Sequence, residues 1–114
     1  MTIVPHPRFL ELTPPHQALM RLLQRVDFGS VSFVVRSGAP DLKSPHRVVR
    51  TLKLGGSGPR PRPETTITDF ELRREHTALL AQLAALADGT RVKVKVAHGL
   101  PGPSIDLEED HRAA

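Results

Sequence analysis

The chain has 114 residues and a formal net charge of +4, from 16 Lys and Arg against 12 Asp and Glu. This length favours one compact domain over residues 1–114. The absence of cysteine excludes disulfides and thiol chemistry, so any zinc site would need histidine and carboxylate ligands alone. No apolar run approaches the roughly 18 residues of a membrane span, and the N-terminus lacks the apolar segment of a signal peptide. We therefore predict a soluble, cytoplasmic protein with no membrane partner.

The first predicted element is a helix that begins after Thr13. Residues 1–12 before it fit either a short strand at Thr2–Val4 or a flexible arm. Thr13 is a good N-cap, and the two prolines after it suit a first helical turn, which needs no intrahelical N–H donors. Gly29 ends the helical stretch. The predicted buried stripe has helical spacing and consists of Ala18, Leu19, Leu22, Leu23 and Val26.

A β-hairpin is predicted to follow this helix. Apolar residues recur at every second position from Val31 to Val35, which indicates a half-buried strand. The segment Arg36–Pro45 is rich in turn-forming residues and is predicted to be a long loop. A return strand is predicted over His46–Leu54, where Arg50 shares a face with apolar residues. A bulge or an edge position would resolve that conflict.

A linker separates this hairpin from a second predicted helix. Residues 55–67 are first Gly-rich and then rich in Pro and Arg, which is typical of a flexible and then extended segment. Thr68 and Glu71 fit a capping box, so the helix is predicted to begin at Thr68 and to stop at Asp88-Gly89. Its predicted apolar stripe consists of Leu72, His76, Leu79, Leu80, Leu83, Leu86 and Ala87.

The second predicted hairpin alternates strictly. Residues 91–96 place three valines on one face and three cations on the other, and a turn is predicted at Leu100–Pro103. Beyond the turn, Ile105 and Leu107 are predicted to point inward. The basic face of one strand would then lie beside an acidic face of the other, so cross-strand ion pairs explain both charge rows without an external ligand. The outward residues are Arg91, Lys93 and Lys95 on the first strand and Asp106 and Glu108 on the second.

The two helix-hairpin units, residues 13–54 and 68–110, repeat one another at an offset of 61 residues. Residues 18–40 align with 79–101 without a gap and share seven identities in 23 positions, where unrelated sequences would share about one or two. We therefore predict an α+β fold of order α-β-β-α-β-β. Its sheet would be four-stranded and mostly antiparallel, with both helices on one face and a pseudo-two-fold axis between the units. The identities pair Leu19 with Leu80, Leu22 with Leu83, Asp27 with Asp88, Val31 with Val92, Val35 with Val96, Gly38 with Gly99 and Pro40 with Pro101.

The first unit also carries a short combination of motifs. Leucines of the helix are followed by Phe28-Gly29-Ser30-Val31, by apolar Phe33-Val34-Val35, and by a strand that ends Arg50-Thr51-Leu52-Lys53-Leu54. In these residues, within 16–54, the chain resembles the small bacterial YezD-like family. It departs from that family by its longer hairpin loop, its linker and its second unit. The family has no assigned activity, so the resemblance implies a helix-plus-hairpin shape and no catalytic residues.

The sequence lacks the patterns that are typical of catalysis, and we predict a non-enzymatic protein with no catalytic residue, metal or cofactor. Its six histidines are not at metal-ligand spacing. His76 falls on an apolar helix face, as a boundary histidine with one hydrogen bond or as a pH-sensitive packing position. Asp27 and Asp88 occupy equivalent positions in the repeat. Each is expected to bond nearby backbone N–H groups rather than to act as acid or base.

Charge is divided unevenly between the two halves of the chain. Residues 1–63 hold ten Lys and Arg against three Asp and Glu, a balance of +7, whereas residues 64–114 hold six against nine, a balance of −3. We predict that the basic half contacts an anionic partner, with DNA or RNA backbone as the first choice. No aromatic residues alternate with these cations, which disfavours base stacking. The predicted contact residues are Arg21, Arg25, Arg36, Arg47, Arg50, Lys53, Arg60 and Arg62.

Other hypotheses stay open beside this one. The basic residues can form an ordinary solvated surface, or the two halves can attract each other within a chain or between copies. The protein can also be an interaction adaptor or a small subunit of a larger complex, which would use a sheet edge or the Pro-Arg linker. Free sheet edges further favour a homodimer formed by strand pairing.

Overall fold

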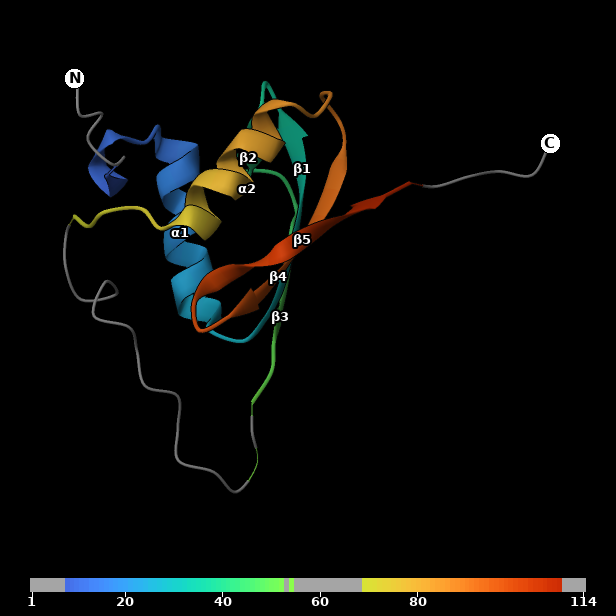
Figure 1. Ribbon diagram of the computed structural model, residues 1–114. Coiled ribbons are helices and arrows are strands. Elements are labelled where there is room, and N and C mark those ends of the chain that lie inside the picture. Colours follow the sequence, from blue (N-terminus) through green and yellow to red (C-terminus); the bar gives the residue numbers. More distant parts are fainter. Residues whose placement is uncertain (1–7, 53, 55–68, 110–114) are drawn as a thin grey trace, which may run out of the picture.

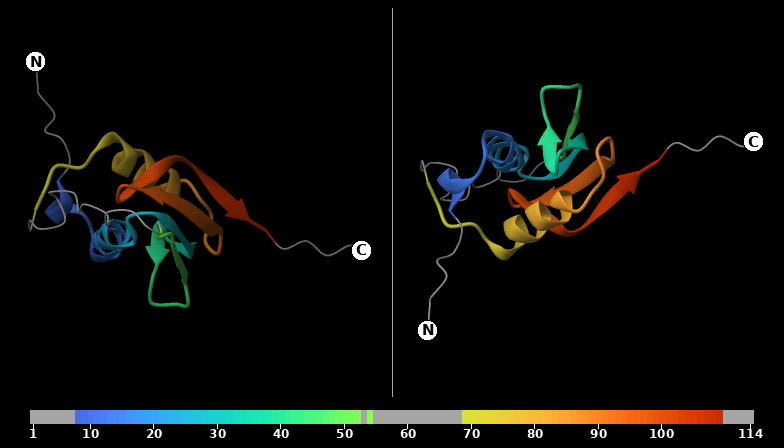
Figure 2. Two further views of the ribbon diagram at one scale, coloured as in Figure 1. Left: turned by 90° about the horizontal axis from the view of Figure 1, so that it is seen from below. Right: turned by 90° about the horizontal axis from the view of Figure 1, so that it is seen from above.

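The computed structural model describes residues 8–52, 54 and 69–109. In these residues the chain forms two α-helices and a five-stranded antiparallel sheet, in the order α-β-β-β-α-β-β. Both helices cover one face of the sheet, and the other face is open (Figures 1 and 2). The predicted α+β class is confirmed. The predicted number of four strands is wrong, because the first hairpin divides its return strand in two. The strand or arm predicted at Thr2–Val4 and the linker predicted at 55–67 lie outside the described residues.

Helix α1 spans Pro14–Val26, and Thr13 holds the N-cap position as predicted, but its hydroxyl bonds with His16 Nδ1 and makes no capping bond to the backbone. A short 3-10 helix, η1 (Phe9–Glu11), precedes it. Four of the five predicted stripe residues are buried, whereas Ala18 is exposed and Met20 is fully buried instead. The stripe was misplaced at its N-terminal end because several apolar residues follow one another there, so periodicity alone does not fix which of them face the core.

The first hairpin comprises β1 (Gly29–Arg36), β2 (Ala39–Asp41) and β3 (Arg47–Arg50). Its turn is Ser37-Gly38, whose φ angles of 52° and 73° suit a two-residue hairpin turn. The prediction of one long loop over Arg36–Pro45 is therefore wrong, since β2 begins directly after that turn. The chain then leaves the sheet and returns as β3, which pairs only with β1 among the described strands. An edge position was one of the two explanations considered above for Arg50 sharing a face with apolar residues.

Helix α2 spans Arg74–Ala84, so the predicted start at Thr68 is wrong. The backbone N–H of Arg73 donates to Nδ1 of His76 at 3.0 Å, and this bond closes the first turn. Glu71, which the predicted capping box used, instead forms an isolated antiparallel bridge with Arg8. The tertiary contact with the N-terminal segment thus prevails over a local capping signal.

The second hairpin comprises β4 (Arg91–Ala97) and β5 (Leu100–Glu108). The predicted turn at Leu100–Pro103 is wrong, because the chain reverses two residues earlier at His98-Gly99, where φ is 55° and 74°. The register then shifts between Val94 and Val96, which marks a bulge in β5. Pro101 and Pro103, which were expected in the turn, thus lie inside the edge strand β5, where a missing backbone N–H is tolerated.

The two hairpins share their geometry at the offset that the sequence repeat indicates. Their turns are 61 residues apart, and each has the same pair of positive φ angles. Val35 lies opposite Pro40 just as Val96 lies opposite Pro101. The central strands β1 and β4 lie side by side and antiparallel, β2 and β3 follow the outer edge of β1, and β5 follows the outer edge of β4.

The core lies between the helices and the covered face of the sheet. Alternate residues of β1 and β4, from Val31 and from Val92 onward, are at most 5% exposed and pack against leucines of both helices. One end of the core is closed by Phe9 and Phe70, whose rings stack with centroids 5.1 Å apart. These two residues are also 61 positions apart, so the offset of the repeat extends to Phe9, which precedes the first unit.

Candidate functional site

The face of the sheet away from the helices carries a row of cations. Alternation along β4 buries its valines in the core and leaves Arg91, Lys93 and Lys95 on the open face. Strand β3 adds Arg47, whose register partner on β1 is Ser32. Register partners in a sheet share a face, and Ser32 is also the partner of Lys93. Arg47, Ser32 and Lys93 therefore lie in one row across three strands.

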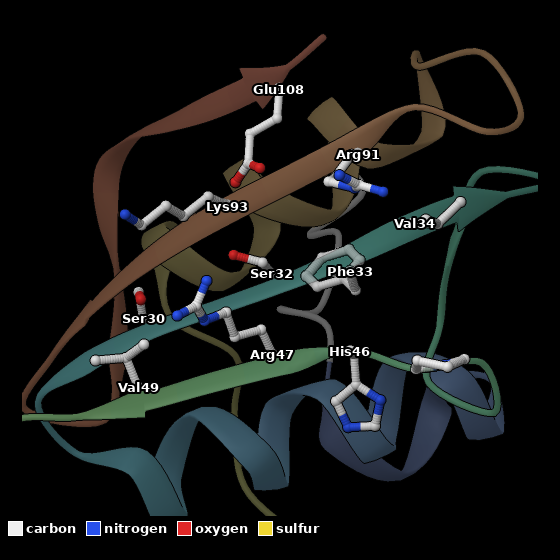
Figure 3. A pocket seen from close by; sticks show the side chains of 11 residues that line it. Ser30, Ser32, Phe33, Val34, His46, Arg47, Val49, Arg91, Lys93 and Glu108 are labelled. Carbon is white, nitrogen blue, oxygen red and sulfur yellow. The ribbon is translucent and has the colours of Figure 1, made fainter. Parts of the chain in front are cut away.

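Four of these side chains, those of Ser32, Arg47, Arg91 and Lys93, line a shallow hollow of about 560 Å³, which we call the sheet-face hollow. Figure 3 shows Arg47 extending over β1 beside Ser32, while Lys93 and Arg91 project from the neighbouring strand and point in different directions. The cations are thus spread along the hollow and do not surround a single point. The residues that define it here are Ser30, Ser32, Arg47, Arg91, Lys93 and Glu108.

Two of these cations have an acidic residue opposite them on β5. The register places Glu108 opposite Arg91 and Asp106 opposite Lys93, which confirms the predicted juxtaposition of a basic and an acidic row. Lys95 lies at the β5 bulge, and Arg47 lies opposite Ser32. Neither has an acidic residue as its register partner, so the open face keeps a surplus of positive charge.

The eight predicted contact residues do not gather on one surface. Arg47 lines the sheet-face hollow, whereas Arg25 is exposed on α1, on the opposite side of the sheet. Arg50 is also on the helix side, because its register partner Gly29 shares the face of Val31. Three others, which are Lys53, Arg60 and Arg62, lie outside the described residues.

Arg21 and Arg36 are each engaged within the protein. The Arg21 guanidinium lies 4.3 Å from the centroid of the Phe9 ring and 5.3 Å from that of Phe70, in a cation–π arrangement. The Arg36 Nε donates to Asp41 Oδ2 at 3.1 Å. Hydrogen bonds from Ser44 and then from Arg36 keep the pKa of Asp41 below its usual range, so this carboxylate is charged at neutral pH. Both arginines therefore have structural roles and are less available to an external anion.

Sequence reasoning missed Arg91 and Lys93 as members of the site. The alternation along their strand correctly predicts that they point outward. Their charges, however, were explained only by ion pairs with the acidic residues of the adjoining strand. The signal that joins them to Arg47 is the pairing of β1 with both β3 and β4. That pairing connects residues 47 and 93 through a third strand, which periodicity within one hairpin does not show.

The equivalent aspartates each contact the hairpin turn of the other unit. The Asp88 carboxylate accepts a hydrogen bond from the Ser37 backbone N–H at 2.7 Å, across 51 residues of sequence. Asp27 uses its backbone carbonyl to accept from the Gly99 N–H at 3.0 Å. The expectation of bonds to nearby N–H groups is therefore wrong, because each aspartate accepts its bond from a turn that is remote in sequence.

Metal binding and membrane insertion have no structural counterpart in the described residues. No group of three or more His, Asp or Glu side chains there is placed to hold a metal ion. His76 is 2% exposed, and its Nδ1 accepts the bond from Arg73 that closes the first turn of α2. Within the same residues, neither helix has the length and apolar character needed to cross a bilayer.

Comparison of the chain with protein-family models, curated proteins and solved structures gives no match. The resemblance to the YezD-like family therefore stays a prediction from the motifs of the first unit. Function has to be argued from the geometry of the molecule itself.

Proposed function

We propose that this protein is a non-enzymatic binding module for an anionic polymer, with nucleic-acid backbone as the first choice, and that the sheet-face hollow is its contact surface. The observation that carries this proposal is the placement of Arg47, Arg91 and Lys93 from two strands along one open hollow. Lys95 extends the same row along β4. Phosphate contacts of this kind supply most of the sequence-independent affinity of proteins for nucleic acids.

The spacing of these cations favours a polymer over a compact anion. Outward residues two apart on a strand lie about 7 Å from each other, so Arg91, Lys93 and Lys95 present separate charges along a line. A site for one small anion would instead direct several donors at one point, as bidentate arginines do. Charges set along a line match the repeated charges of a nucleic-acid backbone.

The surface composition favours binding without sequence preference. The hollow carries the Ser30 and Ser32 hydroxyls between its cations, and of the two aromatic rings that line it, Phe33 is 2% exposed and His46 is exposed, so successive bases would find a single accessible ring. Single-stranded sequence is usually read through bases stacked on such rings. We therefore expect similar affinity for mixed sequences of equal length and charge.

A salt titration of binding to mixed-sequence single- and double-stranded oligonucleotides tests the proposal. The affinity is expected to fall steeply with salt, because each phosphate contact contributes about −0.7 to −0.9 to the slope of log K against log salt. The combined variant Arg47→Gln, Arg91→Gln and Lys93→Gln should flatten that slope by about 2 and weaken binding at low salt at least about tenfold.

The matched control removes the same number of charges from the helix side. It combines Arg25→Gln, Arg50→Gln and Arg74→Gln, all of which are exposed, and so reaches the same net charge. Binding by the hollow requires the control to keep most of its affinity. An equal loss in both variants would show that only net charge matters, and no binding by the wild type at low salt would refute the proposal outright.

The alternative function, a protein-interaction adaptor, is supported by a different part of the molecule. Strands β3 and β5 form the two outer sides of the sheet, and each pairs on one side only within the described residues.

A further inference from the structure

The outer strands β3 and β5 are also where apolar side chains are exposed. Five large hydrophobic residues are exposed in the described part of the chain; two of them belong to these strands, and two more lie two and four residues after the end of β3. A sheet edge offers backbone N–H and C=O groups to any further strand. Edge backbone and exposed apolar side chains together are typical of a surface that pairs with another strand. The four residues are Val49 at 44%, Leu52 at 68%, Leu54 at 97% and Leu107 at 49% exposure.

The two edges are equivalent in the repeat and opposite in charge. Ser32 and Lys93 are equivalent residues of the central strands, and their outer partners are Arg47 and Asp106. One step further along, Val48 of β3 corresponds to Leu107 of β5. On the open face the β3 edge therefore carries Arg47, whereas the matching stretch of β5 carries Asp106 and Glu108, and Arg50 of β3 lies on the helix side. Like edges of two copies would repel, and unlike edges would attract.

The strand directions allow unlike edges to pair directly. β1 and β4 are antiparallel, β3 is antiparallel to β1, and β5 is antiparallel to β4. It follows that β3 and β5 run in opposite directions. A second copy moved sideways without rotation would place its β5 antiparallel to β3 of the first, with the helices of both copies on the same face.

Backbone groups at the β3 edge are oriented for this pairing. The Thr51 N–H donates to the Phe28 carbonyl at 2.8 Å, so Thr51 and Val49 direct their backbone groups toward β1. Val48 and Arg50, which alternate with them, direct their N–H and C=O groups outward. A strand added there would bond to these two residues, and opposite charges would lie across the new pairing.

We propose that copies of this protein associate head to tail, with the basic β3 edge of one copy paired to the acidic β5 edge of the next. The partner strand at each edge thus comes from a second copy of the same chain. The basic β3 edge is complementary in charge to a β5 edge and not to another β3 edge, and the reverse holds for β5. A contact between unlike surfaces leaves one free β3 edge and one free β5 edge on the resulting dimer. Further copies can therefore add at both ends, and the assembly extends as a row of copies with one continuous sheet.

Sedimentation equilibrium of the full chain over a concentration series tests this proposal. The average mass is expected to rise past that of a dimer between about 10 µM and about 1 mM, since short edge contacts of this size are weak. Two variants each block one edge. Arg50→Pro removes an outward N–H without breaking a bond to β1, and Leu107→Lys places a charge on the apolar part of β5.

Mixing the two variants distinguishes head-to-tail pairing from a symmetric dimer. Each variant alone is expected to stay monomeric, whereas their equimolar mixture should stop at a one-to-one dimer, because one intact β3 edge meets one intact β5 edge. Leu10→Lys is the matched control, since Leu10 is 52% exposed and remote from both edges, and it should associate like the wild type. Far-ultraviolet circular dichroism and thermal unfolding check that each variant is folded.

Other outcomes overturn the inference. A wild type that stays monomeric up to about 1 mM excludes self-association through these edges, and a search for a foreign strand partner would then follow. A mass that stops at a dimer, with Arg50→Pro still dimeric, would assign the contact to two β5 edges. None of these variants changes a cation that defines the sheet-face hollow, so the salt titration with oligonucleotides can fail or succeed independently.

Discussion

The two halves of this molecule hold each other's hairpin turns, but they do so by different chemistry. Asp88 of the second unit uses its carboxylate to accept the Ser37 N–H in the first turn at 2.7 Å. At the equivalent place, the Asp27 backbone carbonyl accepts the Gly99 N–H of the second turn at 3.0 Å. Phe28 adds an edge-on ring contact to His98, with centroids 4.8 Å apart. The first turn is thus held by an aspartate side chain, whereas the second turn is held by a backbone carbonyl and a contact between two rings.

The outer strands differ more strongly than the turns. After the shared turn, β5 leaves the ladder only for a bulge, whereas the first unit makes the excursion from Asp41 to Arg47. Asp41 holds this excursion in place, because its carboxylate accepts bonds from the backbone N–H groups of Lys43 and Ser44 and from the Ser44 hydroxyl. The repeat therefore keeps the inner strands and their turns alike, and allows the outer strands to diverge in path and charge.

The substitution expected to have the largest effect on stability is at Gly29. The first unit needs glycine at this position, whereas the second unit has Thr90 at the equivalent position. Gly29 has φ of 146°, and an added Cβ would overlap the backbone carbonyl of Val49 in β3. Gly29→Ala is expected to lower the free energy of unfolding by at least about 3 kcal/mol, because strain and a backbone clash add together. Urea or thermal unfolding measures this loss.

Gly89→Ala is the control for this substitution. Gly89 also has a positive φ, of 86°, but a Cβ there would have nothing within 4 Å. Only the conformational cost remains, about 1 kcal/mol. Equal losses in the two variants would mean that the approach of β3 to Gly29 is not as close as described.

The second test removes the carboxylate that links Asp88 to the first turn. Asp88→Ala is expected to cost about 1 kcal/mol of unfolding free energy, the usual value of one hydrogen bond. Asp88→Asn keeps an acceptor oxygen and should cost less than half as much. Amide hydrogen exchange provides the local measurement, and faster exchange at Ser37 in the alanine variant alone would match this geometry. Unchanged exchange at Ser37 would contradict it.

Much of this architecture is predictable from the sequence, and the failures have a common cause. Thr13 as N-cap, the inward valines of both central strands and the α+β class follow from local patterns. The start of α2 does not, because Glu71 pairs with Arg8 instead of capping a helix. The candidate site fails for the same reason, since Arg47 and Lys93 are joined only through β1, a strand remote from both in sequence. Periodicity predicts which side chains of one strand share a face, whereas a site also depends on which strands the fold pairs with one another.

A third test concerns the acidic side of the sheet-face hollow, and it rests on the proposed function. Glu108 lies opposite Arg91, whereas its counterpart in the first unit is the neutral Val49. Neutralising it by Glu108→Gln is expected to raise the affinity for an oligonucleotide about two- to fivefold at low salt, because one repelling charge is removed. Glu75→Gln on α2 makes the same change in net charge and should leave the affinity nearly unchanged. Equal increases in the two variants would assign the effect to net charge.

The smallest expected effect concerns the contact between the segments that precede the two helices. Arg8 donates to Asp69 at 2.8 Å, and the Leu10 N–H donates to the other carboxylate oxygen at 3.0 Å. The bond from Arg8 is the main cause that lowers the pKa of Asp69, and the bond from Leu10 comes next. A carboxyl whose pKa is lower in the folded state stabilises the fold above its unfolded pKa of about 3.9, and that contribution is lost as the pH falls through the folded value.

Asp69→Asn tests this dependence by comparing unfolding at several values of pH. The variant is expected to be slightly less stable than the wild type near pH 6, and the difference should disappear as the pH falls through the lowered pKa of Asp69, because the wild-type carboxyl then becomes protonated as well. A difference that stays constant over this range would show that the charge of Asp69 does not matter. The stacked pair of Phe9 and Phe70 would then hold these equivalent segments together mainly by apolar contact.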